Sequence, residues 1–360
     1  MRPRLARSWV LLLALLGASG CASFGPVSVD RDRFDYIQAI ATSWKQQTLI
    51  NIVKLRYNDT PVFLDVSQII GSYQLQAGVS VGGGVNFGGP PLPNTLSLGT
   101  AATYTDRPTV VYTPLTGAAF IKVLMTPIPP PALFPLIESG WPADLLLQLG
   151  AQTVNGISNK KGGVRGRAAD PAFGQLLAAL QRIQASGAVS LRTEVSKETK
   201  QEGVLLTLGR KDSSAEILAD QELVRKLLGL RPGLREFKIV YGVLAEGDDV
   251  IAIQTRSSFQ IMGELGADIQ VPAEHAAERR TYPTRSEPAG PDALQPLVRI
   301  ESGTSAPGDA FAAVKYRDHW YWIDDRDFRS KGVFTFLMVI MTLAEKAEKA
   351  PPPVVTIPAN

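Results

Sequence analysis

The sequence predicts an α+β fold: antiparallel sheets covered by helices, with a long uncharged β-hairpin arm and an N-terminal helix. Two observations predict it. Apolar residues alternate with small or polar ones on both sides of a Gly/Pro-rich break within residues 69–112, which is typical of paired strands. In the second half, pairs of short β-branched segments alternate with segments of helical periodicity, in a strand–strand–helix order that recurs. That order favours antiparallel pairs with helices on one side.

The predicted hairpin has an apolar row on each strand, odd-numbered before the break and even-numbered after it. These membrane- or partner-facing rows include Ala77, Val79, Val81, Val85 and Phe87, then Leu96, Leu98 and Tyr104. The break at residues 88–93 suits a chain reversal. No Asp, Glu, Lys or Arg occurs between Asp65 and Asp106, whereas a water-facing edge normally carries charge.

An uncharged hairpin of this length has two interpretations. A membrane-spanning strand needs about 9 to 11 alternating residues, and both strands reach that length. Ala77, Gly83 and Thr100 in the apolar rows would make only weak contacts with lipid. The alternative is therefore a hairpin that packs on its own domain or on a neighbouring subunit.

Residues 1–20 are predicted to be a signal peptide. Basic residues precede a short apolar run at 9–16, and small residues then lead to Cys21. The run is too short to span a bilayer as a stable anchor. Cys21 is the only cysteine, so it makes no internal disulfide.

The sequence Ala18-Ser19-Gly20-Cys21 resembles the lipobox of bacterial lipoproteins, with Ala18 where leucine is usual. The resemblance implies that Cys21 is acylated, for example with palmitate, and becomes the mature N-terminus. Ala22 replaces the aspartate that retains such proteins at the inner membrane, which implies outer-membrane lipid as a partner. Acyl chains contribute about 0.8 kcal/mol per buried CH₂, so several chains anchor durably.

Three further segments carry a second resemblance: FDYIQAIATSWKQQTLINIVKLRYNDTPVFLDVSQII, YTDRPTVVYTPLTG and YWIDDRDFRSKGVFTFLM. They resemble outer-membrane lipoproteins of Gram-negative bacteria that have no established activity. The resemblance implies the compartment, with the body in the periplasm, and gives no mechanism.

The remaining elements follow from periodicity and from Gly/Pro boundaries. We expect a tether at 21–29 and a region 30–157, which has a helix at about 30–57, short helices at 118–125 and 132–138, and an ambiguous segment at 145–157. The glycine-rich, basic run at 158–168 is expected to be a linker or an exposed loop. In the α+β domain 169–348 we expect helices at 171–185, 213–228, 257–266 and 327–346, strands near 189–195, 204–208, 237–243, 250–254, 297–301, 311–316 and 320–323, a flexible segment at 278–296, and a tail at 349–360. The last helix is too short to span a membrane and is expected to be buried.

Neither charge nor short motifs indicate a catalytic chemistry. With 37 basic and 34 acidic residues the net charge is +3, which gives no electrostatic case for nucleic acid. Gly82–Gly84 lack the third glycine and the following helix of a dinucleotide site. Ser158 and Lys161 match a Ser-x-x-Lys spacing, but the companion motifs are missing.

Histidine is scarce, and His275 and His319 are isolated in the sequence without metal-ligand spacing. We therefore expect no enzyme activity, no cofactor and no metal site.

A polar and aromatic cluster near the C-terminus is a possible partner surface. Trp320 and Trp322 share one face of a predicted strand, and Arg326 follows; interfaces favour such residues. Asp324, Asp325 and Asp327 suit either a cation site or, more plainly, a helix N-terminus.

The sequence thus favours a non-catalytic outer-membrane lipoprotein that oligomerises through its hairpin into a membrane-embedded or pore-like assembly. Closing such a structure takes about eight strands, hence at least about four copies. The alternative is a monomeric lipid-anchored periplasmic scaffold or adaptor that binds another envelope protein.

Overall fold

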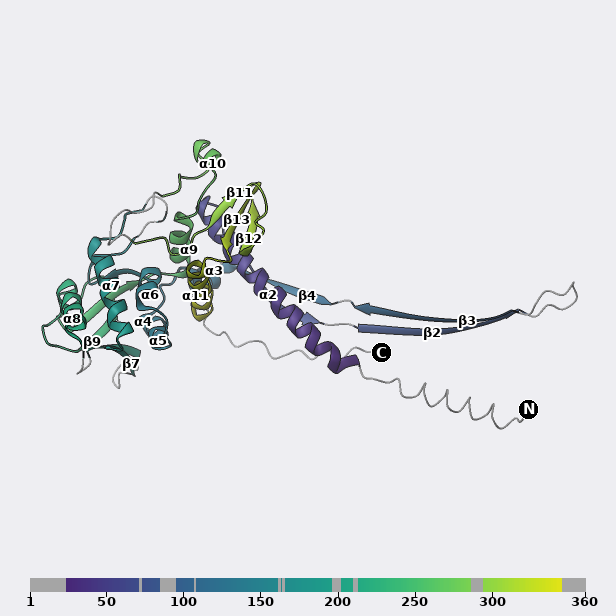
Figure 1. Cartoon of the computed structure of the whole chain (residues 1–360), viewed down its shortest axis with the longest axis horizontal. Helices are drawn as coiled ribbons and strands as arrows, with labels where there is room; N and C mark the ends of the chain where they lie inside the picture. Colours follow the sequence, from purple (N-terminus) through teal and green to yellow (C-terminus); the bar gives the residue numbers. More distant parts are fainter. Residues whose placement is uncertain are drawn as a thin grey trace, which may run out of the picture. The chain divides into compact units, whose positions relative to one another are not determined.

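The computed structural model describes residues 24–70, 73–84, 95–106, 108–160, 163, 166–195, 202–209, 213–285 and 294–344. Over these residues the fold is α+β, as predicted (Figure 1). The chain forms two compact units: a body built from the residues up to Pro61 and from Ile121 onward, and a ribbon unit, Val62–Phe120. None of the helices within the described ranges has the length and apolarity that crossing a bilayer requires.

Helix α2 (Phe24–Arg56) opens the described chain. The predicted start at Asp30 was wrong, because the helix already includes Phe24 and thus most of the expected tether. Its C-terminal part is buried, with Leu49 and Ile52 fully covered. The helix ends where Asn58 adopts a left-handed conformation (φ 59°), which asparagine tolerates better than most residues.

The hairpin is confirmed and is longer than predicted. Strands β2 (Tyr73–Gly84) and β3 (Thr95–Asp106) pair antiparallel from Tyr73 opposite Asp106 to Gly84 opposite Thr95. Strands β1 (Phe63–Ile70) and β4 (Thr109–Leu115) form a second antiparallel ladder, with a bulge near Val66. The backbone therefore forms a two-stranded ribbon with its paired residues between 63 and 115.

The body contains a six-stranded sheet in the order β6-β5-β10-β9-β8-β7. Its strands are β5 (Ala151–Val154), β6 (Ile157–Ser158), β7 (Val189–Val195), β8 (Glu202–Leu208), β9 (Glu236–Tyr241) and β10 (Val250–Thr255). All pairs are antiparallel except β9–β10, which are parallel. The expectation of purely antiparallel pairing was wrong for β9–β10, because residues 242–249 return the chain to the same end of the sheet without a helix.

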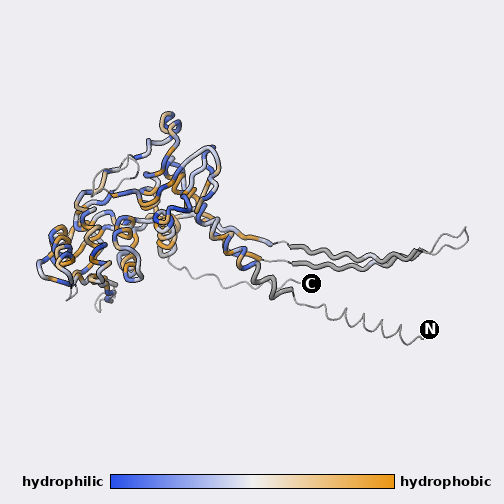
Figure 2. Tube along the Cα trace, in the orientation of Figure 1, coloured by the Kyte–Doolittle hydropathy of each residue, from blue (hydrophilic) through white to orange (hydrophobic). Residues whose placement is uncertain are grey.

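Helices cover one face of this sheet, as the pattern indicated. They are α4 (Pro130–Leu133), α5 (Pro135–Glu138), α6 (Ala143–Gly150), α7 (Pro171–Ala185) and α8 (Ala215–Leu228). Leu176 of α7 and Val224 of α8 face Ile239 and Ile251 of the sheet, and all four are buried. On β9 the alternate residue Lys238 is exposed, so the sheet there has one apolar, buried face and one solvent-exposed face. Hydrophobic and hydrophilic residues accordingly intermix along the body (Figure 2).

Residues 158–168 do not divide the chain, so the predicted linker was wrong. Strand β5 on one side of them pairs with β10 on the other, within one compact unit. Asn159 is buried and donates to the carbonyls of Gln148 and Ala151 at 2.8 and 2.7 Å. Gly-rich, Lys-rich composition suggested an exposed loop, whereas backbone acceptors satisfy the buried amide.

A second sheet, in the order β11-β13-β12, packs in the body against α2, and α9 packs against the same helix. The elements are β11 (Glu301–Gly303), β12 (Ala310–Tyr316), β13 (His319–Asp324), α9 (Ser258–Ala267) and α11 (Phe328–Ala344). In α11, Phe334 and Leu337 are fully buried, which confirms the expected core helix. A capping box of Ser257 and Gln260 starts α9.

The remaining helices are α3 (Gly117–Met125) and α10 (Ala273–Ala277). The ambiguous segment 145–157 begins as the end of α6 and then becomes β5 and β6. The expectation of a flexible segment at 278–296 was wrong for residues 278–285. There, Arg56 donates to the carbonyls of Tyr282 and Pro283 at 2.7 and 3.0 Å, and Thr281 donates to the Arg56 carbonyl. The tail 349–360 lies outside the described residues.

Candidate functional site

The ribbon register places the two predicted apolar rows opposite each other. The pairs are Leu75–Tyr104, Ala77–Ala102, Val79–Thr100, Val81–Leu98 and Gly83–Leu96. Residues directly opposite in an antiparallel pair belong to the same face, so the register places both rows on one face of the ribbon. Cys21, Val85 and Phe87 lie outside the described residues.

The base of the ribbon exposes apolar side chains. Leu64 and Ile70 of β1, and Val111 and Tyr112 of β4, are exposed. Over the described ranges no third strand pairs with either ladder. A two-stranded ribbon alone is at best marginally stable in water. Pairing with additional strands, or packing against another surface, would stabilise it.

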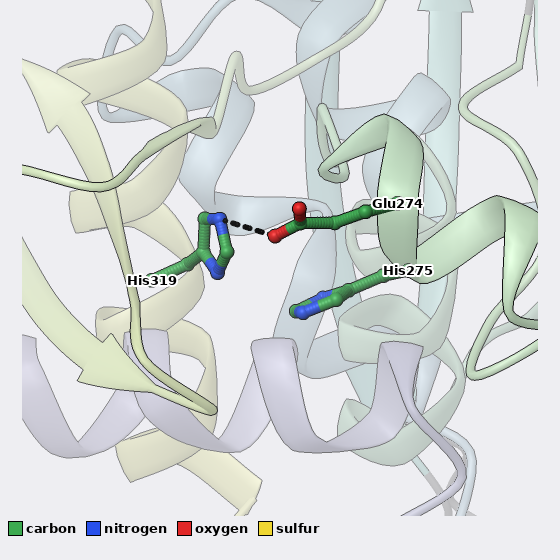
Figure 3. Close-up of side chains that lie close together, drawn as sticks. All are labelled: Glu274, His275 and His319. Carbon is green, nitrogen blue, oxygen red and sulfur yellow. Dashed lines mark ion pairs between the residues drawn. The ribbon is translucent and has the colours of Figure 1, made fainter.

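A second site is a cluster of aromatic and acidic side chains in the body. We name Tyr57, Glu274, His275, His319 and Tyr321 the tyrosine–histidine cluster. Tyr57 follows α2, Glu274 and His275 belong to α10, and His319 and Tyr321 belong to β13. Glu274 and the two histidine rings converge from their two elements (Figure 3).

The Tyr57 hydroxyl lies within hydrogen-bonding distance of two other members of this cluster. Its Oη lies 2.6 Å from Oη of Tyr321 and 2.7 Å from Nδ1 of His275. The Tyr57 and His275 rings meet edge to face, with centroids 5.6 Å apart. The His275 and His319 rings do the same at 4.8 Å. Both histidines and both tyrosines are buried, so the hydroxyls and ring nitrogens depend on one another for hydrogen bonds.

A tight turn places His319 at this position. Arg317 and Asp318 both have positive φ, 47° and 65°, and Tyr316 pairs with His319 across the turn. Two successive left-handed residues define the type I′ turn that suits a two-residue hairpin loop. The reversal therefore falls at Arg317-Asp318.

His319 uses its two ring nitrogens in different directions. Nε2 lies 3.1 Å from Oε1 of Glu274, the contact drawn as a dashed line in Figure 3. Nδ1 lies 3.4 Å from the carbonyl oxygen of Arg317. The histidine side chain is 10% exposed and that of Glu274 is 63% exposed, so one side of the cluster opens to solvent.

Burial shifts the pKa values of His275, Tyr57 and Tyr321. Burial lowers the pKa of His275, and the neighbouring His319 and Arg280 lower this pKa further. Burial also raises the pKa of Tyr57 and of Tyr321. At neutral pH the phenols are therefore protonated and His275 is the neutral imidazole, with one donor and one acceptor nitrogen.

Glu274, His275 and His319 are the described residues that group as possible metal ligands. Each offers one ligand atom, and these atoms lie within 4.8 Å of one another. Sequence reasoning missed this grouping, because the histidines occupy a helix and a strand far apart in the chain. The available signal was that the chain has only two histidines, and spacing alone does not bring them together.

The predicted Trp surface is only partly exposed. Tyr321 and Ile323 point into the core, whereas Trp320 and Trp322 alternate with them and are half-buried. A Cβ on Gly303 would lie 3.2 Å from the Trp322 ring, so that ring covers the neighbouring strand. Arg326 is exposed, 3.6 Å from Asp309.

Three aspartates, the last residue of β13 and two just after it, organise the start of α11. Asp324 accepts from the Arg326 N–H at 2.7 Å, and Asp327 accepts from Ser330 N–H at 3.0 Å. Asp325 pairs with Lys331 at 2.8 Å. These contacts agree with the helix N-terminus interpretation.

No family model, curated protein or solved structure matches the chain. The features that bear on function are therefore an α+β body with a buried tyrosine–histidine cluster and a separate two-stranded ribbon.

Proposed function

We propose that the protein is a non-catalytic lipoprotein of the Gram-negative outer membrane. Acylated Cys21 holds it in the membrane, and its ribbon joins the ribbons of other copies in a membrane-embedded or pore-like assembly. The observation that carries the proposal is the β2–β3 ladder, which pairs twelve residues of each strand with Asp106 as its one charged member.

The length of this ladder suits a bilayer. Twelve residues span eleven steps of about 3.3 Å, or about 36 Å, and a tilt of about 40° reduces that to about 28 Å. The hydrocarbon core of a membrane is about 30 Å thick. An uncharged ladder of this length fits that layer, whereas a solvated arm gains nothing from avoiding charge over forty residues.

The pairing also supports self-association over an isolated ribbon. Each ribbon leaves two outer edges, and backbone groups on an open edge in lipid have no partners. Copies of the same ribbon supply such partners, and about eight strands close the structure. The row opposite to the apolar one, with Ser80, Ser97 and Thr103, then faces a polar interior.

Helix α2 supports the anchoring part of the proposal. It begins by Phe24, shortly after Cys21, and its first fully buried side chains are those of Thr48 and Leu49. At about 1.5 Å per residue, the helix between these points measures about 36 Å. Phe34 and Ile37 on this stretch are exposed. An acylated Cys21 would thus be spaced from the body by a helical stalk.

Aspartate substitutions on the two rows test the assembly. Val81→Asp with Leu98→Asp places charge on one apolar pair, and a charge on the lipid face destabilises a membrane barrel most near the midplane. The matched control is Ser80→Asp with Ser97→Asp, on the polar row. Outer-membrane fractions are analysed by native and mild SDS gels. We expect the apolar-row variant to lose the oligomer and the control to keep it. An intact oligomer in the apolar-row variant, or equal loss in both, contradicts the proposal.

Anchoring is tested separately with Cys21→Ser. We expect this variant to leave the outer-membrane fraction or to remain unprocessed at the inner membrane. Firm attachment of the processed variant to the outer membrane would remove the lipid-anchor part of the proposal.

A further inference from the structure

The only two histidines of the chain converge on one carboxylate. Their ring centroids are 4.8 Å apart, and Nε2 of His319 lies 3.1 Å from Oε1 of Glu274. The three residues offer ligand atoms that all lie within 4.8 Å of one another. Both imidazoles are buried, while the carboxylate reaches the site from the solvent side.

This ligand set has a definite preference among metals. Two imidazoles and one carboxylate with an open fourth position suit Zn²⁺ and its neighbours in the first transition row. Bonds of about 2.0–2.2 Å at tetrahedral angles separate ligand atoms by about 3.4 Å. The His319–Glu274 contact is already near this value. The other ligand atoms lie within 4.8 Å of one another, so ligation requires side-chain rotations that shorten these separations.

The surrounding hydrogen bonds orient both rings for ligation. Tyr57 Oη engages Nδ1 of His275 at 2.7 Å, which leaves Nε2 for a metal. The Arg317 carbonyl lies 3.4 Å from Nδ1 of His319, which leaves Nε2 pointing at Glu274. Metal-bound histidines use the second nitrogen in this way, and such partners fix the ring and its tautomer.

Nearby charges exclude hard cations. Arg317 stacks on Tyr57 with 5.0 Å between its guanidinium carbon and the ring centroid, and Arg280 acts electrostatically on His275. One carboxylate beside two arginines is a poor site for Mg²⁺ or Ca²⁺, which prefer several oxygen ligands. Affinity must come from the imidazole nitrogens.

We propose that Glu274, His275 and His319 bind one divalent transition-metal ion of the Zn²⁺ type, joining α10 to β13. This site lies in the body and is independent of the ribbon assembly, so its failure leaves the proposed function untouched.

The test uses the full mature protein in detergent, purified with a tag that contains no histidine and stripped with chelator. Calorimetric titration with Zn²⁺ should show one ion per chain, and Mg²⁺ should show none. Co²⁺ should give the visible absorption of a site with nitrogen ligands. Glu274→Gln should weaken Zn²⁺ binding about 10-fold or more, and His319→Gln should abolish it. Glu278→Gln, on an exposed neighbour that pairs with Arg280, is the control and should bind normally.

Stabilisation gives a second readout. Zn²⁺ should raise the melting temperature of the wild-type protein and of Glu278→Gln, but not that of Glu274→Gln. If His319→Gln does not fold, the solvent-exposed Glu274→Gln variant decides the question. Absence of stoichiometric binding by the wild type overturns the proposal. Unchanged binding by Glu274→Gln, or equal loss in Glu278→Gln, overturns it too.

Discussion

The hydroxyl oxygens of Tyr57 and Tyr321 lie 2.6 Å apart in the interior of the body. Tyr57 follows the N-terminal helix α2, and Tyr321 lies on β13, the central strand of its sheet. The contact therefore ties the start of the body to its C-terminal part, and Tyr321 has no solvent exposure. Because the same Tyr57 hydroxyl also meets His275, one oxygen connects three elements.

Tyr57→Phe removes this shared hydroxyl and leaves two buried partners unpaired. We expect a loss of about 2 to 3 kcal/mol in the free energy of unfolding, since unpaired buried polar groups cost more than the bond itself. Denaturant titration of Tyr57→Phe, Tyr321→Phe and the double variant measures it. The double variant should lose less than the sum of the single losses; strictly additive losses would contradict a shared network.

Gly266 marks the closest approach of α9 to α2. A Cβ at this position would lie 3.1 Å from the backbone oxygen of Ile52 and 3.7 Å from the Arg56 nitrogen. Because helical backbone cannot easily give way, we expect Gly266→Ala to destabilise the protein by about 1 to 3 kcal/mol.

The matched control lies on the same helix. A Cβ at Gly263 meets nothing within 4 Å, so Gly263→Ala should be neutral or stabilise by up to about 1 kcal/mol through helix propensity. Thermal unfolding of the two variants compares them directly. Equal changes in the melting temperatures of the two variants would contradict the expected steric clash at Gly266 with the α2 backbone.

Arg182 and Asp220 link α7 to α8 through two hydrogen bonds of 2.8 and 2.6 Å. The hydrogen bonds from Arg182 lower the pKa of the Asp220 carboxyl. The folded state therefore holds this proton less tightly than the unfolded chain. The pair's stabilisation is present above the ordinary aspartate pKa of about 4 and is lost as the pH falls through the lowered value.

Asp220→Asn should accordingly cost about 1 to 2 kcal/mol at pH 7. The difference from the wild type should shrink steadily below about pH 4. Urea titrations at a series of pH values provide the measurement. A difference that stays constant down to the acid limit would assign the effect to packing rather than to the charge.

The sequence predicted the elements that depend on local pattern. Alternation identified the ribbon, because its pleat has a period of two whatever lies around it. The predicted helix at 213–228 is α8, where Ser214 is the N-cap and Gly229 a left-handed C-cap, both local signals. The apolar run in α11 indicated burial, and Phe334 and Leu337 are in the core.

Features that depend on long-range pairing could not be predicted in this way. The parallel register of β9 and β10 is set by how residues 242–249 return the chain. Asn159 looked like part of a solvated loop, yet backbone carbonyls satisfy its buried amide. His275 and His319 have no sequence spacing that reveals their contact, because a helix and a strand bring them together.

The central claim is that ribbons of several chains assemble into one structure. The most direct measurement is the mass of the native, detergent-extracted protein by light scattering coupled to size exclusion, with the detergent mass subtracted. The account predicts a single species of at least about four chains, since about eight strands are needed for closure. A monodisperse single chain of 38.8 kDa or less would contradict it.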